Sequence, residues 1–213
     1  MKKIFIAGAG GMLGEAFYQR FKDDFQLLCT DKDINSDWLQ YLDFKDSIAY
    51  EKNVIKFNPD FLFHIGAYTD LEFCELNPED ALLTNTKSVE TAVHISNKLR
   101  IPLLYISTAG IFNGKEESYD DWSKPDPLGV YAKTKFQGEE FVVKNSLKYL
   151  ICRAGWMMGG GPKKDKKFIN KIIKQIKLGK NEIFIVDDKD GTPTYTHDFA
   201  LNTKKLFELE YWG

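Results

Sequence analysis

A tyrosine and a lysine four positions apart, Tyr131 and Lys135, have the types and spacing needed for proton transfer. Positions i and i+4 of a helix share one face, so the ammonium group of Lys135 can favour the phenolate and lower the pKa of Tyr131. A tyrosine tuned in this way exchanges a proton with a reacting carbonyl group, while the lysine can also hold a nicotinamide ribose. The pair therefore indicates carbonyl chemistry.

Position along the chain separates this pair from two segments with the same spacing, Tyr18–Lys22 and Tyr41–Lys45. Tyr131 follows Ser107 and Thr108, which we expect at the carboxyl end of a strand, where ligands of parallel sheets bind. Thr108 can then share a hydrogen bond to the carbonyl oxygen of a substrate. Ordinary polar capping of the strand end is the alternative interpretation of these two hydroxyls, and the sequence leaves it open.

A glycine-rich segment follows the first apolar run, Ile4–Ala7, and reads Gly8-Ala9-Gly10-Gly11-Met12-Leu13-Gly14. Its GxxGxxG spacing places glycine where the chain turns sharply into a helix, and where a Cβ would keep a pyrophosphate from the helix N-terminus. Asp31 lies 23 residues beyond Gly8, close to the separation expected of a carboxylate that binds a ribose diol. Together these features predict a dinucleotide site.

The carboxylate of Asp31 would repel a 2′-phosphate, so we expect NADH as the cofactor, with NADPH as the alternative because Lys32 is adjacent. A second pair, Asp43-Phe44, precedes the next helix and can meet the adenine ring through a hydrogen bond and an apolar contact. A turn residue followed by a core aromatic explains Asp43-Phe44 equally well.

Short apolar runs alternate with longer segments of helical period. The expected strands are Ile4–Ala7, Gln26–Thr30, Phe61–Ile65, Leu103–Ser107, Tyr149–Arg153 and Glu182–Val186. The expected helices are Met12–Lys22, Lys45–Phe57, Glu79–Leu99, Val130–Asn145, Lys167–Leu178 and His197–Leu209. Asn77 can cap the third helix, and Pro78 fits its first position. Strands that are apolar on both faces indicate helices on both sides, so the pattern predicts an α/β fold with a doubly wound parallel sheet.

Composition excludes several classes of partner. Of 213 residues, 43% are hydrophobic and 28% charged, and 29 basic against 31 acidic residues give a net charge of −2, so nucleic acid is not expected. No apolar stretch reaches the about 18 residues that span a bilayer, so no membrane partner is expected. The three cysteines form no CxxC pair, which predicts a reduced, cytoplasmic protein, and the three histidines form no cluster that predicts a metal site.

The segment Lys163–Lys180 carries eight lysines and one acidic residue, with apolar residues at helical spacing. Such a helix can lie on a membrane surface or in the groove of a partner. A helix that faces the core with a solvated lysine face is commoner, and we expect that arrangement. One or two of these lysines also suit a substrate diphosphate.

The order of these motifs resembles that of one enzyme superfamily. The set comprises the glycines Gly8, Gly11 and Gly14, then Asp31, Asp43-Phe44, Gly66-Ala67-Tyr68-Thr69, Ser107-Thr108, Tyr131 with Lys135, Arg153 with Trp156, and Gly191-Thr192-Pro193-Thr194-Tyr195. It resembles the extended short-chain dehydrogenases/reductases and, among them, most closely the dTDP-4-dehydrorhamnose reductase family. The resemblance covers nearly the whole chain, and its last element is more discriminating than the glycine motif.

The resemblance implies Thr108, Tyr131 and Lys135 as catalytic residues. The implied cofactor contacts are Gly8, Gly11, Met12, Leu13, Gly14, Asp31, Asp43, Phe44, Ile65, Gly66 and Ala67, together with Tyr131 and Lys135. The implied substrate contacts are Thr108, Ala109 and Trp156. Residues 1–153 would form a Rossmann-like dinucleotide-binding domain, with an abbreviated substrate-facing region, residues 154–213, packed on it. The implied reaction is NAD(P)H-dependent reduction of the 4-keto group of a nucleotide-linked deoxysugar, with dTDP-4-dehydro-L-rhamnose as the leading substrate, and a homodimer is compatible with it.

Three departures from the family pattern keep other functions open. Ala109-Gly110 replaces an acidic residue followed by a tyrosine, which also argues against a 4,6-dehydratase, since elimination needs an acid and a base there. His64 replaces a small amide, and we expect a strand histidine satisfied by local hydrogen bonds, while Gly66 interrupts an alanine run. The chain ends at Gly213 where related reductases continue, so substrate affinity should suffer more than cofactor binding. The alternatives are a catalytically silent NAD(P)-binding module, resembling the regulatory subunit of methionine adenosyltransferase, and a reductase or epimerase of another nucleotide sugar.

Overall fold

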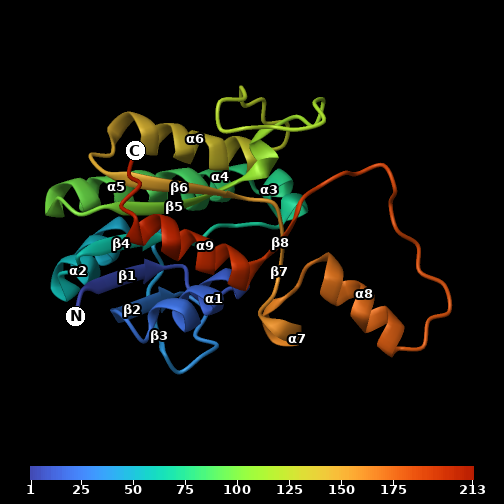
Figure 1. The fold of residues 1–213 in the computed structure, drawn as a ribbon, viewed down its shortest axis with the longest axis horizontal. Coiled ribbons are helices and arrows are strands. Elements are labelled where there is room, and N and C mark those ends of the chain that lie inside the picture. The colour runs from blue at the N-terminus through green and yellow to red at the C-terminus, as the bar shows by residue number, and fades with distance from the viewer.

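A six-stranded parallel sheet forms the centre of the computed structural model, which describes residues 1–213 (Figure 1). The strands are β1 (Lys3–Ala7), β2 (Gln26–Asp31), β3 (Leu39–Tyr41), β4 (Phe61–His64), β5 (Leu103–Thr108) and β6 (Tyr149–Ala154), in the order β3-β2-β1-β4-β5-β6. Because β2 and β4 pair with opposite sides of β1, the strand order reverses at β1. Such a switch point opens a crevice at the carboxyl ends of the strands, where ligands bind. The predicted fold class is confirmed.

Helices cover both faces of this sheet, as its apolar strands require (Figure 1). They are α1 (Met12–Phe21), α2 (Ser47–Phe57), α3 (Leu71–Leu76), α4 (Pro78–Leu82), α5 (Ser88–Leu99), α6 (Val130–Asn145), α7 (Gly161–Lys164), α8 (Phe168–Lys177) and α9 (Thr196–Glu208). Helices α1 and α9 pack together on one face, and α2, α5 and α6 cover the other. A π-helical turn (Leu83–Lys87) joins α4 to α5, while β7 (Trp156–Met158) and β8 (Pro193–Tyr195) form a separate parallel pair.

Alternate residues of β1 enter two different hydrophobic cores. Ile4 and Ile6 belong to the cluster that contains residues of α1 and α9, whereas Phe5 and Ala7 belong to the cluster with α2, α5 and α6. All four side chains are fully buried. Burial of each large apolar side chain contributes about 1.5–3 kcal/mol, so β1 is held firmly from both sides. The loop that follows Ala7 therefore leaves the sheet from a fixed point.

Three local predictions are wrong. The expected strand Glu182–Val186 does not form, and its Phe184 side chain is 92% exposed. The expected helix Glu79–Leu99 is interrupted by the π-helical turn. Asn77 stands at the N-cap of α4, but its side chain donates to the carbonyl oxygen of Phe73 and does not cap the helix. The prediction also lacks β3, β7 and β8, each only three residues long.

Helix α8 forms as predicted but lies away from the six-stranded sheet (Figure 1). Its apolar side chains Phe168, Ile169, Ile173 and Ile176 are 41–59% exposed, so the expectation of a core-facing helix is wrong. The boundary between residues 1–153 and 154–213 stays a prediction. Helix α9, from the second part, packs against α1 in the core of the first.

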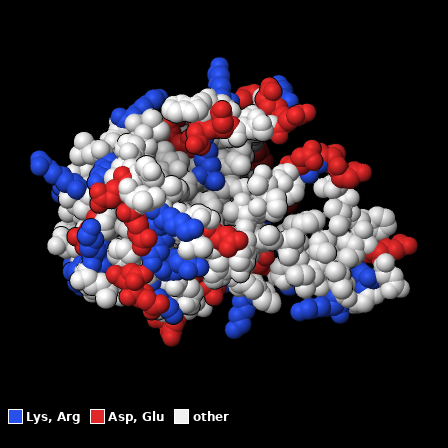
Figure 2. Space-filling model, viewed as in Figure 1, with Lys and Arg blue, Asp and Glu red and all other residues white.

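The surface carries charges of both signs. Figure 2 shows basic and acidic side chains interspersed over the body of the molecule, in keeping with its near-neutral net charge. All three cysteines are free thiols. No helix of the structure is both long enough and apolar enough to cross a membrane.

Candidate active site

The glycine loop after β1 leaves its backbone open to a ligand. Gly8 has a φ of +83°, and a Cβ on it would lie 2.1 Å from the Cα of Gly66, so the loops after β1 and β4 meet backbone to backbone. Gly11 is the N-cap of α1, with no atom within 4 Å of its missing Cβ and no side chain capping the helix. The first-turn N–H groups, including those of Met12 and Leu13, are therefore suited to the pyrophosphate of a dinucleotide.

Two residues of this loop also have structural roles. The side chain of Leu13 is buried in the core between the sheet, α1 and α9, so it can reach a cofactor only through its main chain. Gly14 lies against the backbone of Ala9, where a Cβ would come within 2.1 Å of the carbonyl oxygen. The glycine pattern thus serves packing as well as ligand access.

Asp31, at the end of β2, holds the glycine loop in place. Its Oδ2 accepts the N–H of Gly10 at 2.8 Å, and its Oδ1 accepts the N–H of Asp33 at 2.9 Å. The Nδ2 of Asn35 donates to the carbonyl oxygen of Gly10 at 2.9 Å and closes the same turn. Both carboxylate oxygens of Asp31 therefore have backbone partners, and its predicted contact with a ribose must share them.

Phe44 fills the space beneath the two crossing loops. A Cβ on Gly66 would come within 2.4 Å of its Cε1, which explains why glycine interrupts the alanine run. The Phe44 ring also meets the His64 ring edge-on, with centroids 5.0 Å apart. Asp43 accepts the N–H of Lys45 on Oδ1 at 3.0 Å, as turn residues do. A turn residue and a packed aromatic account for these contacts, and contact of the pair with adenine stays a prediction.

The segment after β4 is anchored to β1 and to a buried asparagine. The N–H groups of Ile65 and Gly66 both donate to the carbonyl oxygen of Ala7, at 3.0 and 3.1 Å. The Oδ1 of Asn85 accepts the N–H of Tyr68 at 2.8 Å, and its Nδ2 donates to the carbonyl oxygen of Tyr68 at 3.1 Å. Ala67, which lies between these anchors, is half-buried. Asn85 is absent from the sequence predictions because it lies in the π-helical turn, far along the chain from the loop it holds.

Thr108, at the end of β5, and Tyr131, at the start of α6, lie near each other at the carboxyl edge of the sheet. Burial raises the pKa of Tyr131 above its ordinary value, and a hydrogen bond from the Thr108 hydroxyl opposes that rise. Thr108 Oγ1 accepts the N–H of Gly110 at 3.1 Å, so its own proton is not used in that bond. The carboxylate of Glu75 accepts the N–H of Val130 at 2.7 Å and fixes the start of α6, one residue before Tyr131. Tyr131 therefore holds its proton at neutral pH.

Lys135 shares this region with Tyr131, but its ammonium group points to the sheet. Its Nζ donates to the carbonyl oxygen of Ile106 at 2.7 Å and lies 4.2 Å from the centroid of the Tyr105 ring. Burial lowers the pKa of Lys135 to about 7, while the charge of Glu139 acts in the opposite direction. The pKa of Tyr131 is raised by burial, opposite in direction to the lowering that the sequence predicts. The expected lowering of the tyrosine pKa by this lysine is therefore not seen.

His64 is fully buried at the end of β4, and both ring nitrogens have partners. Nδ1 lies 3.1 Å from the Tyr50 hydroxyl, and Nε2 lies 3.1 Å from Ser88 Oγ. Because Ser88 donates its hydroxyl proton to the carbonyl oxygen of Thr84, Nε2 must be the protonated nitrogen, and Nδ1 accepts from Tyr50. Burial lowers the pKa of His64 to about 3, and the nearby charge of Lys135 adds to this. The expectation of a locally satisfied strand histidine is confirmed.

The predicted substrate side of the site is open. Ala109 and Gly110, which follow Thr108, are exposed and place no polar side chain at this edge. Trp156 lies on β7 and is 51% exposed, and its ring packs against Gly191. The main-chain N–H of Trp156 donates to the carbonyl oxygen of Thr192 at 2.8 Å, which joins the two late motifs. Their contact with a sugar nucleotide stays a prediction.

A glycine loop at the switch point of a parallel sheet, with a threonine and a tyrosine near each other at the carboxyl end of β5, defines a dinucleotide-binding protein of the short-chain dehydrogenase/reductase class. The family model described as RmlD substrate binding domain matches residues 1–212, and the chain belongs to this family.

Curated relatives align along nearly the whole chain. The spore coat polysaccharide biosynthesis protein SpsK of Bacillus subtilis is 28% identical over 97% of this chain and 70% of its own length. The beta subunit of methionine adenosyltransferase 2 from Xenopus tropicalis is 26% identical over 97% of this chain and 62% of its own length. The dTDP-4-dehydrorhamnose reductase of Aggregatibacter actinomycetemcomitans is 28% identical over 94% and 65%. The chain thus spans about two thirds of the length of these relatives.

Solved structures agree with the fold. The dTDP-4-dehydrorhamnose reductase of Bacillus anthracis, in complex with NADP, superimposes with a TM-score of 0.90 at 29% identity, over 100% of this chain and 73% of its own. The enzyme of the same name from Yersinia enterocolitica gives a TM-score of 0.87 at 32% identity, with the same coverage of both chains.

Proposed function

We propose that this chain reduces the 4-keto group of a nucleotide-linked deoxysugar with NAD(P)H, and that dTDP-4-dehydro-L-rhamnose, converted to dTDP-L-rhamnose, is the substrate. One observation carries the proposal. Thr108 ends β5 and lies near Tyr131 of α6 at the carboxyl edge of the sheet, the same edge at which the open glycine loop follows β1. The reductase names of two relatives and the NADP complex of one solved neighbour support the choice of reaction and cofactor.

Different residues transfer the proton and stabilise the developing charge. When bound, the dinucleotide supplies the hydride for the carbonyl carbon. Tyr131 keeps its proton at neutral pH, because burial raises its pKa, and can transfer that proton to the oxygen as negative charge develops there. Thr108 can donate a hydrogen bond to the same oxygen. Lys135, whose Nζ donates to the carbonyl oxygen of Ile106, is positively charged below about pH 7 and is suited to bind the nicotinamide ribose.

The test is oxidation of NADH and NADPH, followed by absorbance, with enzymatically prepared dTDP-4-dehydro-L-rhamnose. Tyr131→Phe should lose most turnover, by about 100-fold or more, since it removes the general acid, while cofactor binding is retained. Tyr18→Phe is the matched control, because Tyr18 also precedes a lysine by four residues but stacks on Trp38, away from the strand end. Turnover of Tyr131→Phe within about threefold of the parent would refute the assigned role.

A catalytically silent dinucleotide-binding module is the second candidate. The exposed Ala109-Gly110 leaves the substrate edge without an acid, and the Xenopus tropicalis relative is named as a subunit of another enzyme. Cofactor binding without turnover of the sugar nucleotide would favour this candidate. Turnover with other nucleotide-linked keto sugars would indicate a reductase or epimerase of a different substrate. The cytoplasmic location and the homodimer stay predictions.

A further inference from the structure

We propose that helix α8 binds the surface of an anionic lipid bilayer, with its apolar face among the acyl chains and its lysines among the headgroups. Such binding goes beyond the proposed reaction and does not depend on it. It departs from the sequence expectation of no membrane partner. Attachment to one surface of the bilayer is meant, since no helix of the structure is both long enough and apolar enough to cross it.

One face of α8 is apolar and uncovered. The apolar residues recur at the spacing of a single helix face. They are Phe168, Ile169, Ile172, Ile173 and Ile176. Ile172 is half-buried, and the other four side chains are 41–59% exposed. A helix of a globular protein normally buries such a face in its core, so this face lacks the partner that its pattern requires.

The position of α8 leaves this face accessible. Figure 1 shows α8 beside the six-stranded sheet and on neither of its two faces. The surface over this part of the molecule is largely uncharged in Figure 2, with basic side chains at its margin. The chain beyond α8 adds three more apolar side chains, since Phe184, Ile185 and Val186 are 54–92% exposed. A large, flat partner can therefore reach an extended apolar surface here.

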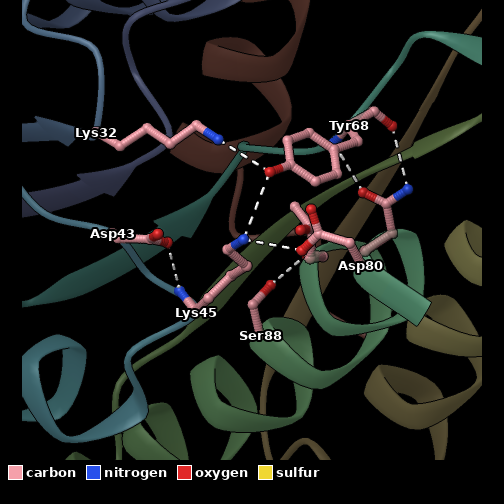
Figure 3. Close-up of polar contacts among 8 residues, drawn as sticks. Lys32, Asp43, Lys45, Tyr68, Asp80 and Ser88 are labelled. Carbon is pink, nitrogen blue, oxygen red and sulfur yellow. Dashed lines mark hydrogen bonds and ion pairs between the residues drawn. The ribbon is translucent and has the colours of Figure 1, made fainter. Parts of the chain in front are cut away.

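The other side of α8 carries lysines that have no acidic partner. Lys171, Lys174 and Lys177 recur every three residues, and all three are exposed. None of them forms an ion pair, whereas lysines elsewhere do, as Lys45 does with Asp80 at 2.8 Å (Figure 3). Each unpaired lysine close to an anionic surface strengthens binding about fivefold, so these charges favour a negatively charged partner.

Most of the neighbouring lysines are also unused by the fold. Residues 163–180 hold eight lysines and one acidic residue, Asp165, which is buried and accepts the main-chain N–H of Lys167. Lys164 forms an ion pair, and the Nζ of Lys167 donates to the carbonyl oxygen of Thr69 at 2.8 Å. These two contacts leave six of the eight lysines for a partner.

An anionic bilayer complements both sides of α8. Residues 163–190 hold nine lysines against five acidic residues, a net charge of +4 in a chain whose total is −2. An amphipathic helix with a lysine-rich polar face lies in the plane of the bilayer interface. A second copy of the chain would bring the same unpaired lysines to the contact, so it would match the apolar face but not the charge.

The experiment is co-sedimentation of the full chain with two kinds of vesicle, phosphatidylcholine alone and phosphatidylcholine mixed equally with phosphatidylglycerol. The parent chain should bind the mixed vesicles about tenfold more tightly or better, because only these carry negative charge. Added salt should weaken that binding, because it screens the exposed lysines.

Two substitutions separate the apolar from the charged contribution. Ile173→Ser should weaken binding to the mixed vesicles by about fivefold or more, because it removes a side chain that enters the acyl region. Lys174→Gln should weaken it by about fivefold at low salt. The matched controls lie on α2 and should leave binding unchanged. Ile55→Ser replaces an isoleucine that is 41% exposed, as Ile173 is, and Lys56→Gln removes an exposed lysine.

Three results would overturn the lipid site. They are failure of the parent chain to bind either kind of vesicle, equal binding to both kinds, and equal losses in the α8 variants and their α2 controls. Self-association of the parent chain without vesicles, abolished by Ile173→Ser, would make a second copy the occupant of α8 and would also overturn it. Turnover of the sugar nucleotide is measured without vesicles, so none of these results bears on the reductase proposal.

Discussion

Acid should destabilise this protein through a single buried histidine. His64 is held neutral between the Tyr50 hydroxyl and Ser88 Oγ, with Nδ1 as an acceptor. Its pKa is about 3 in the folded chain, because burial disfavours the charged ring, compared with 6.5 for an ordinary histidine. Protonation at Nδ1 would place a donor against the donating Tyr50 hydroxyl. The unfolded chain therefore binds this proton more readily than the folded chain.

The sign and size of the effect follow from linkage. Between pH 3 and 6.5 the unfolded state binds more protons, so the free energy of unfolding rises with pH in that window and is lost on acidification. From about pH 7 to about pH 5 the loss attributable to His64 amounts to about 2 kcal/mol. This is a large part of the about 5–15 kcal/mol that stabilises an ordinary domain.

Urea unfolding at several pH values, with and without His64→Asn, measures this contribution. Asparagine does not titrate and keeps a polar side chain at this position. The variant should be less stable at neutral pH, and its free energy of unfolding should fall by about 2 kcal/mol less than that of the parent between about pH 7 and pH 5. The parallel observation is an NMR titration, in which the His64 ring should not protonate while the chain is folded. Equal pH slopes for the two chains, or a His64 ring that titrates near 6, would refute the reasoning.

Three substitutions test other parts of the site. Gly66→Ala should lower the free energy of unfolding by about 1–3 kcal/mol, since its Cβ would lie 2.4 Å from the Phe44 ring. Gly11→Ala should change the free energy of unfolding by less than about 1 kcal/mol but weaken NADH binding by about tenfold. Urea midpoints and calorimetry distinguish the two, and a stable Gly66→Ala chain would contradict the packing argument. Glu139→Gln should cost about 3 kcal/mol, because the buried Glu139 carboxylate pairs with Arg153 at 2.6 Å, and an unfolding midpoint within error of the parent would show that the pair is dispensable.

Residues close together in sequence predicted their own arrangement well. The glycine loop, the start of α1 and the placement of Tyr131 and Lys135 on α6 depend on helix geometry and turn stereochemistry, which act over a few residues. The apolar runs of β1, β4 and β5 also predicted buried central strands, because a strand covered on both faces must be apolar throughout. These features follow from local rules.

Features that depend on a distant partner were missed or predicted wrongly. The segment Glu182–Val186 has the composition of a strand, but a strand needs a paired neighbour, and the segment belongs to neither sheet. β3 has only three residues and is defined by its pairing with β2. Asn85 matters because its amide reaches the backbone of Tyr68, 17 residues away, and no local pattern marks it.

Charge states at the site belong to this second group as well. The i, i+4 spacing correctly places Lys135 on the helix that carries Tyr131, yet the side chain turns to the carbonyl oxygen of Ile106, because a buried ammonium group requires an acceptor. Its pKa of about 7, and that of about 3 for His64, result mainly from burial, which depends on how β4, β5 and α6 pack. A pattern of residue types therefore predicts which groups meet, while the packing of the whole sheet decides which of them carry a proton.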